Sequence, residues 1–201
     1  MLTHLRRSVV LTLISIVFFG FVYAFAGTGV AQVLFRHQAD GSLTANGSTL
    51  IGQNWTSPDF FHGRPDDAGP YAANPKAKPP VAGGDNPLVA NGSSGESGAT
   101  NLGPRSKVLL ANTKALVAYW HSLGVANPTP DLVTTSGSGY DPDISPADAI
   151  VQIPMVAKAR GLSDSVLLSL IHSQTHGAEL GFLGSSYINV LELNEALSRL
   201  H

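Results

Sequence analysis

The chain has 201 residues, a formal net charge of −2 at neutral pH and no cysteine. The absence of cysteine excludes disulfides, thiolate zinc sites and thiol catalysis. The near-neutral charge, with no basic block, excludes the electrostatic footprint of a nucleic-acid-binding protein. The length allows one domain with a hydrophobic core in addition to an N-terminal segment.

An apolar run without a charged residue extends from Ser8 to Ala26. As a helix it would cover about 28 Å, close to the ~30 Å hydrocarbon core of a bilayer. Arg6 and Arg7 precede it, and basic flanks tend to stay in the cytoplasm. The sequence therefore predicts a cytoplasmic N-terminus (1–7), a transmembrane helix (8–28), a connector (29–46) and a soluble domain outside the cytoplasm (47–201).

A cleaved signal peptide is the alternative interpretation of this run. The small residues around Phe25 are typical of a cleavage site. However, apolar residues continue to Phe35, which favours an uncleaved anchor. Both interpretations place the domain outside the cytoplasm.

The first half of the domain is rich in turns. A short strand is predicted over 47–53, followed by a long Gly/Pro-rich loop over 66–100. Apolar residues at helical spacing predict a helix from about Pro104 to His121, ended by Gly124. A second strand is predicted over 132–135, followed by a loop over 136–144.

The second half carries clearer helix signals. Ser145 as N-cap, Pro146 and Asp148 predict a helix start, with the end at Gly161 and either a kink or one lost hydrogen bond at Pro154. Further predictions are a helix capped by Ser163, a strand over 188–190, and a helix over 191–200 whose capping box is Asn189 with Glu192. The predicted class is one transmembrane helix followed by one soluble α/β or α+β domain.

A series of short motifs resembles one known family over nearly the whole chain. The motifs are 48–53 (STLIGQ), 61–65 (FHGRP), 98–104 (GATNLGP), 133–139 (VTTSGSG), Asp141, 144–146 (ISP), 152–154 (QIP), 156–162 (VAKARGL) and 189–194 (NVLELN). Their order and spacing resemble the C subunit of the Kdp potassium-transporting ATPase, a bacterial P-type ATPase complex. Two departures are Tyr140, where the family usually has leucine, and 185–187 (SSY), where it usually has Glu-Pro-Arg.

The resemblance implies a non-catalytic subunit, anchored in the bacterial inner membrane and in contact with its lipid. Its implied partners are a channel-like potassium-binding subunit, a P-type ATPase subunit and a very small hydrophobic subunit. The implied role is to stabilise the assembly, with a second role as a catalytic chaperone that raises the ATPase subunit's affinity for ATP. The family's proposed nucleotide contact would fall on the loop formed by Ser136, Gly137, Ser138 and Gly139, and on Gln152.

Direct contact with ATP conflicts with the predicted topology, because ATP is cytoplasmic and the charge bias places this loop on the other side. The chain has no Walker A pattern, although a Ser/Gly loop can bind an anion through backbone N–H groups. We therefore expect an assembly subunit with no cofactor of its own. Any connection with ATP would be through the ATPase subunit, which binds the nucleotide. The alternatives are a nucleotide-binding regulator using 136–139, and an independent anchored solute-binding or hydrolytic domain, for which no catalytic motif is present.

Four further residues are candidates for structural or partner contacts. Gln53 is expected to be a buried polar anchor, and Arg160 belongs to a motif of the family. One interpretation of His62 and Arg64 is a polar contact to the channel-like subunit or an influence on ion entry. The other is a structural turn, in which Arg64 would pair with Asp66 or Asp67.

Two pairs of residues could bind metal ions. His172 and His176 have the spacing of helical zinc ligands, but two solvated histidines are the favoured interpretation and no metal site is expected. Asp141 and Asp143 could bind a cation, or could simply start a turn.

Overall fold

A computed structural model describes residues 2–53, 55, 57–65, 97 and 99–200. The predicted loop over 66–100 therefore lies almost entirely outside the described residues. The chain separates into two compact units, Met1–Ala45 and Asn46–His201. Each unit is described by itself.

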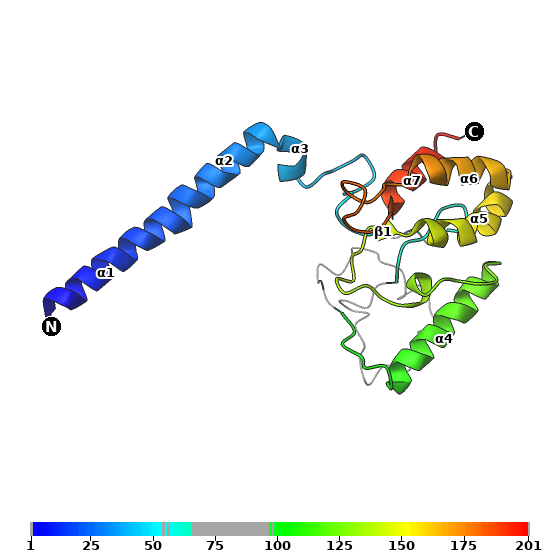
Figure 1. Ribbon diagram of the computed structural model, residues 1–201, viewed down its shortest axis with the longest axis horizontal. Helices are drawn as coiled ribbons and strands as arrows, with labels where there is room; N and C mark the ends of the chain where they lie inside the picture. The colour runs from blue at the N-terminus through cyan, green and yellow to red at the C-terminus, as the bar shows by residue number, and fades with distance from the viewer. Residues whose placement is uncertain (1, 54, 56, 66–96, 98, 201) are drawn as a thin grey trace. The chain divides into compact units, whose positions relative to one another are not determined.

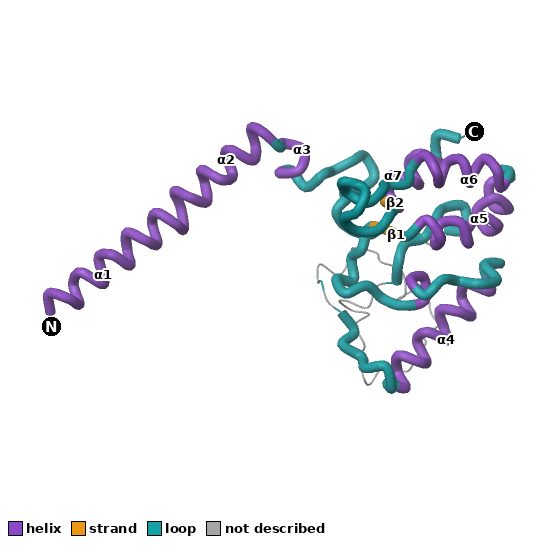
Figure 2. Tube along the Cα trace, viewed as in Figure 1, coloured by secondary structure: helices purple, strands orange, loops and turns teal. Residues whose placement is uncertain are grey.

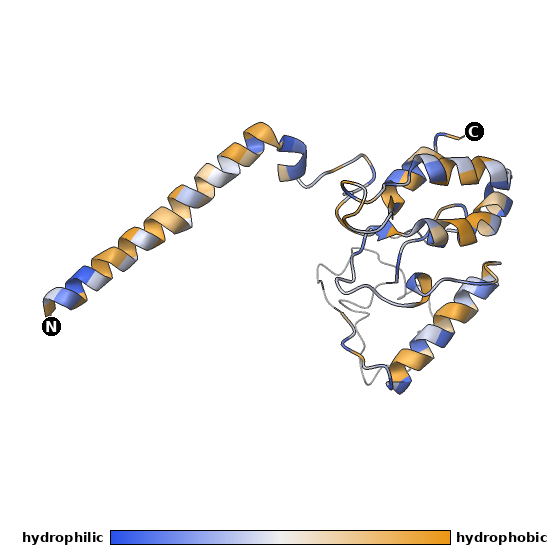
Figure 3. Ribbon diagram, viewed as in Figure 1, coloured by the Kyte–Doolittle hydropathy of each residue, from blue (hydrophilic) through white to orange (hydrophobic). Residues whose placement is uncertain are grey.

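The N-terminal unit is dominated by one long apolar helix. It consists of α1 (Leu2–Val17), a π-helical stretch η1 (Phe18–Tyr23) and α2 (Ala24–Leu34), and a short α3 (Arg36–Ala39) follows. Figure 3 shows the hydrophobic colouring along most of this helix. The continuous helix has 33 residues and is long and apolar enough to cross a membrane. Its most apolar segment buries no residue against the rest of the protein.

A helix of this length spans about 50 Å, more than the ~30 Å hydrocarbon core requires. It starts before the predicted transmembrane segment and ends after it. Exposing this much apolar surface to water is unfavourable, so the hydrocarbon core of a bilayer is the environment that suits the helix. Which of its residues lie in the hydrocarbon stays a prediction.

The second unit is a domain that consists of helices, long loops and a small two-stranded sheet (Figures 1 and 2). Its elements are α4 (Lys107–Ser122), the 3₁₀ helix η3 (Asp131–Val133), β1 (Asp143–Ile144), α5 (Pro146–Arg160), α6 (Asp164–Ser173), β2 (Ile188–Asn189) and α7 (Val190–Leu197). α5 and α6 pack side by side, and α6 also packs on α7. Side chains from all these helices meet in one core, which includes Phe61, Trp120, Val156, Leu167 and Leu193.

The predicted helix ends of α5 are confirmed. Ser145 and Asp148 form a reciprocal capping box, and Gly161 ends the helix at φ +68°, a backbone conformation that favours glycine. α5 continues through Pro154, which only lacks the N–H that would donate to the preceding turn.

The cap of α7 is confirmed in part. The Asn189 side chain accepts a hydrogen bond from the Glu192 N–H, as predicted. Ser163 stands at the N-cap of α6 but makes no side-chain capping bond.

The two strands pair antiparallel, with Asp143 opposite Asn189 and Ile144 opposite Ile188. The strand predicted over 188–190 is confirmed at its first two residues. The loop predicted over 136–144 is wrong at its end, where β1 forms. An antiparallel pair beside segregated helices makes the domain α+β, within the predicted class.

The other two predicted strands are wrong. In 47–53, the Ser48 hydroxyl accepts from the Leu50 N–H, and this local bond makes a turn in place of an extended segment. In 132–135, Leu132 and Val133 belong to η3, whose backbone N–H groups donate to Thr129 and Pro130. Both segments have β-forming residues, but hydrogen bonds accepted by neighbouring Ser, Thr and Pro residues decide their conformation.

Candidate functional site

The segment Phe61–His62 is held by two buried side-chain amides. Asn194, on α7, accepts from the Phe61 N–H at 2.9 Å and donates to the Phe61 carbonyl at 2.8 Å. Gln152, on α5, accepts from the His62 N–H at 2.8 Å and donates to the His62 carbonyl at 3.0 Å. A side-chain amide offers one acceptor and two N–H donors, so it pairs with an extended backbone as a neighbouring strand would. We call these four residues the amide clamp.

The amide clamp defines the position of Gln152, a predicted nucleotide or partner contact. The residue is fully buried, and its Nε2 also donates to the Asp148 carbonyl at 3.2 Å. Its donors and its acceptor are therefore engaged inside the core. Contact with a ligand would require α5 to separate from the segment 61–62.

His62 lies inside the core and not on the surface. Its ring is fully buried beside the rings of Tyr119 and Trp120, and Nε2 is 3.0 Å from the Ser57 carbonyl. Burial lowers the pKa of His62, so the neutral ring is favoured. The bond to a carbonyl places the proton on Nε2, and the buried Nδ1 has no hydrogen-bond partner in the part of the chain that the structure describes. This environment supports the interpretation of His62 as part of a structural turn.

Arg64 pairs with carboxylates that are far away in the sequence. Its guanidinium lies 3.2 Å from Asp141 and 3.6 Å from Asp131, and it also donates to the Thr135 carbonyl at 3.4 Å. The expected partners Asp66 and Asp67 lie outside the described residues. Arg64 thus links the two ends of the segment that contains the Ser-Gly loop.

The Ser-Gly loop, residues 136–139, is closed by its own hydroxyl groups. The Ser136 hydroxyl accepts from the Gly139 N–H at 2.9 Å, and the Ser138 hydroxyl accepts from the Tyr140 N–H at 3.2 Å. Gly139 has φ +72°, which suits glycine. Gly137 and Ser138 are exposed, whereas Ser136 and Gly139 are buried. Two of the N–H groups that an anion would need are therefore occupied by the loop itself.

The nearest helix N-terminus after this loop is also occupied by a group of the chain. The Asp148 carboxylate accepts from the Ser145 N–H at 2.7 Å and from the Thr129 hydroxyl. A carboxylate at this position already interacts with the positive end of the α5 dipole. An incoming phosphate would have to displace it.

Gln53 and Arg160 make local structural contacts. Gln53 donates to the carbonyls of Ser48 and Ile51 at 3.1 and 3.2 Å, and is half-buried. Arg160 donates to the Asp59 carbonyl and lies over the Phe60 ring, with its guanidinium carbon 4.8 Å from the centroid. Gln53 closes the turn that replaced the predicted strand, and Arg160 joins the end of α5 to the loop at 59–60.

The two histidines near the end of α6 are exposed. His176 stacks on Tyr187, with centroids 4.9 Å apart, and its Nε2 is 3.5 Å from Glu192. Among the described residues, no group of three or more His, Asp or Glu side chains is arranged to hold a metal ion. Asp141 pairs with Arg64, and Asp143 accepts from Asn189 at 3.0 Å.

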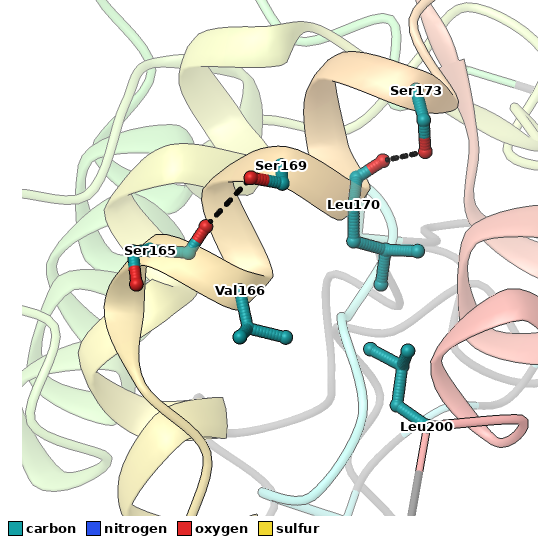
Figure 4. Close-up of a pocket in the computed structure, with 6 residues that line it drawn as sticks. All are labelled: Ser165, Val166, Ser169, Leu170, Ser173 and Leu200. Carbon is teal, nitrogen blue, oxygen red and sulfur yellow. Dashed lines mark hydrogen bonds between the residues drawn. The ribbon is translucent and has the colours of Figure 1, made fainter.

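A shallow pocket of about 430 Å³ lies between α6 and the C-terminal residues (Figure 4). Its lining consists of Ser165, Val166, Ser169, Leu170, Ser173 and Leu200. The hydroxyls of Ser169 and Ser173 donate to carbonyls of α6, so they are not oriented toward a ligand. The pocket has no ionisable side chain in its lining and suggests no chemistry.

Comparison with known proteins identifies the family. A family model described as "K+-transporting ATPase, c chain" matches residues 5–199. The chain belongs to this family, KdpC. Three relatives carry the name "Potassium-transporting ATPase KdpC subunit". The relative from Methylobacterium nodulans is 43% identical over 100% of this chain and 98% of its own length. Those from Caulobacter vibrioides and Rhodopseudomonas palustris are 44% and 41% identical, each over 98% of this chain and over 93% and 97% of their own lengths.

Within this KdpC chain, the structure joins some predicted site residues and separates others. Arg64 lies against the segment of the Ser-Gly loop, and His62 lies against Gln152. Gln53 and Arg160 make contacts of their own elsewhere. Asn194 is not among the predicted site residues, although it ends the motif 189–194 and is a polar residue on the apolar face of α7, between Leu191 and Leu197.

Proposed function

We propose that the chain is a non-catalytic, membrane-anchored subunit of an ATP-driven potassium import complex. The observation that carries this proposal is the full-length match to the KdpC family, together with one exposed apolar helix. In this proposal α1–α2 crosses the inner membrane, with the N-terminus in the cytoplasm and the domain outside it. Arg6 and Arg7 support this orientation, because basic flanks resist translocation.

The proposed partners are the channel-like potassium-binding subunit, the P-type ATPase subunit and the small hydrophobic subunit. The relatives' name, a subunit of a potassium-transporting ATPase, supports membership of such a complex. The proposed role is to stabilise this assembly. In this topology the domain lies on the side of the membrane away from ATP. As a catalytic chaperone, the chain would raise the ATP affinity of the ATPase subunit indirectly, through the membrane subunits.

The geometry of the Ser-Gly loop favours this role over direct nucleotide binding. Its N–H groups at 139 and 140 are engaged by Ser136 and Ser138, and the Asp148 carboxylate occupies the α5 N-terminus. Gln152 is buried in the amide clamp. Nucleotide contact at Ser136–Gly139 and Gln152 stays the competing hypothesis, and it requires a cytoplasmic domain.

The predicted topology can be tested by thiol labelling, because the chain has no cysteine and an introduced cysteine would be its only thiol. We would introduce Ser138→Cys, at an exposed position, and in a separate chain Thr3→Cys, at the exposed N-terminal end of α1. Each would be labelled in cells, within the complex, by a membrane-impermeant thiol reagent from outside the inner membrane. We expect Ser138→Cys to react at once and Thr3→Cys to react only after lysis. The reverse pattern would overturn the proposed topology and make nucleotide binding the leading mechanism.

Co-purification tests membership of the complex. A tagged copy of the chain should recover the other subunits in fixed proportion. Recovery of the tagged chain alone would contradict the proposal and would favour an independent anchored domain.

A further inference from the structure

A hairpin with an apolar tip projects from the domain between α6 and β2. Its base is paired by His176 and Tyr187, which exchange two backbone hydrogen bonds of 2.8 and 3.0 Å. A second pair, Glu179 and Leu183, exchanges two bonds of 2.9 Å. We call residues 176–187 the apolar hairpin. Its backbone is ordered by its own hydrogen bonds.

The tip exposes large apolar side chains. Leu180 is 80% exposed, Phe182 73% and Leu183 51%. Leu180 adopts φ +54°, a conformation that leucine rarely takes, and Gly181 and Gly184 also have positive φ. The described residues of the domain leave these side chains exposed, where polar residues or glycine would suit a turn better. Exposed apolar groups on an ordered hairpin indicate contact with another molecule.

The base of the hairpin is fixed to the rest of the domain. Tyr187 stacks on His176, whose Nε2 lies 3.5 Å from Glu192 of α7. Tyr187 is followed directly by β2, which pairs with β1. The tip is therefore presented in a fixed geometry, and docking loses little conformational entropy.

The charge around the hairpin distinguishes a protein partner from a lipid surface. The sequence from 161 to 198 contains no Lys or Arg, whereas Glu179 is exposed beside the tip and Glu192 is partly exposed at the base. Membrane surfaces with anionic lipids attract basic segments and repel acidic ones. Apolar anchors beside an acidic rim complement an apolar pocket with a basic rim on a protein.

We propose that the tip of the apolar hairpin docks, through Leu180 and Phe182, into an apolar pocket rimmed by basic side chains on a protein partner in the complex. This inference rests on the proposed function, since it needs a complex to dock on. It adds the contact surface on this chain and the chemistry of the surface that receives it. The departure from the family at 185–187 belongs to the same hairpin, where Tyr187 stacks on His176.

The test uses the full complex in native membranes. A photo-reactive benzoyl-phenylalanine would replace Phe182 and, as a matched control, Leu110, which is 56% exposed on α4. We expect a protein adduct from position 182 at least tenfold more abundant than from position 110. Lipid adducts only, or no adduct, from position 182 in a complex recovered intact would overturn the docking proposal. Failure to recover any complex with the unmodified chain would instead overturn the proposed function.

Charge variants test the rim of the partner. In chains carrying the photo-reactive group at 182, Glu179→Gln should lower the adduct yield about threefold and Glu179→Lys at least tenfold, if the partner's rim is basic. Both positions are exposed, so the fold is retained, as tryptophan fluorescence of the purified chain can verify. An unchanged or increased yield with Glu179→Lys would overturn the basic rim.

Discussion

Two regions of the domain place their side chains in opposite ways. In the amide clamp, the polar side chains of Gln152 and Asn194 are fully buried, and each forms hydrogen bonds through both its oxygen and its nitrogen. In the apolar hairpin, Leu180 and Phe182 lie mostly in solvent. A buried amide destabilises a fold unless its donors and acceptor are paired, and pairing here joins segments far apart in the chain. The buried amides of the clamp therefore stabilise the fold, whereas the exposed side chains of the hairpin tip are available for a contact with another molecule.

Among the substitutions of polar side chains, the largest expected effect comes from breaking the clamp. Asn194→Leu conserves volume approximately but leaves the buried N–H and carbonyl of Phe61 without partners. At about 1–3 kcal/mol for each unpaired group, we expect a loss of roughly 3 kcal/mol in the free energy of unfolding. Urea unfolding of the full chain in detergent, followed by Trp55 and Trp120 fluorescence, would measure it. Asn127→Leu, at an exposed position, is the matched control, and equal small losses in both variants would contradict the clamp.

A smaller effect is expected from Arg64→Met. The guanidinium is partly exposed and pairs with Asp131 and Asp141, so we expect a loss of about 1–2 kcal/mol. The amides of the Ser-Gly loop should also exchange hydrogen faster, because Arg64 links the two ends of its segment. Arg105→Met, at an exposed position, should change neither quantity. Unchanged exchange in the Arg64 variant would show that the loop is held by its own serines alone.

The pH dependence of stability tests the junction between the hairpin and the sheet. Burial raises the pKa of Asp143 above its ordinary value of 3.8, and the nearby charges of Asp141 and Glu192 raise it further. The hydrogen bond from Asn189 and the charge of His176 act in the opposite direction and only partly offset this rise. As pH rises through 3.8, the unfolded chain loses this proton first, so ionisation of Asp143 lowers the stability of the fold until pH exceeds the folded pKa.

Asp143→Asn removes that ionisation. We therefore expect the stability of the variant, relative to the unchanged chain, to increase with pH across this window and then to stay constant. Urea midpoints measured from about pH 3 to pH 7 would follow the difference. A difference that falls with rising pH would contradict the raised pKa.

The smallest expected effect is at the hairpin tip. Phe182→Ser removes a large ring, but the ring is exposed, so the free energy of unfolding should change by less than about 0.5 kcal/mol. Phe61→Ser, in the core, should cost about 3 kcal/mol or more in the same urea assay. A large loss at Phe182 would mean that the tip packs within the domain, and the contrast between the two regions would fail.

The local features of the fold could be predicted from the sequence. The apolar run predicted the N-terminal helix, and apolar spacing predicted α4. The signals at Ser145, Asp148 and Gly161 predicted the start and end of α5, and Asn189 predicted the start of α7. These features depend on residues within one or two helical turns, so a reading along the chain captures them. The strands predicted over 47–53 and 132–135 were wrong, because hydrogen bonds accepted by nearby Ser, Thr and Pro residues outweighed β propensity.

The tertiary structure alone decided which side chains meet. Arg64 pairs with Asp131 and Asp141, and Asn194 binds the backbone of Phe61 across 133 residues of sequence. His62 and Gln152 were predicted as candidate contacts from the motifs. In the structure both are buried in the core, where the His62 backbone binds the Gln152 side chain. The apolar N-terminal helix and the ends of α5 could be predicted because they follow from hydropathy and local pattern, and the resemblance to the family followed from the order and spacing of short motifs. The partners of polar groups depend on how distant segments pack, and no local pattern encodes that.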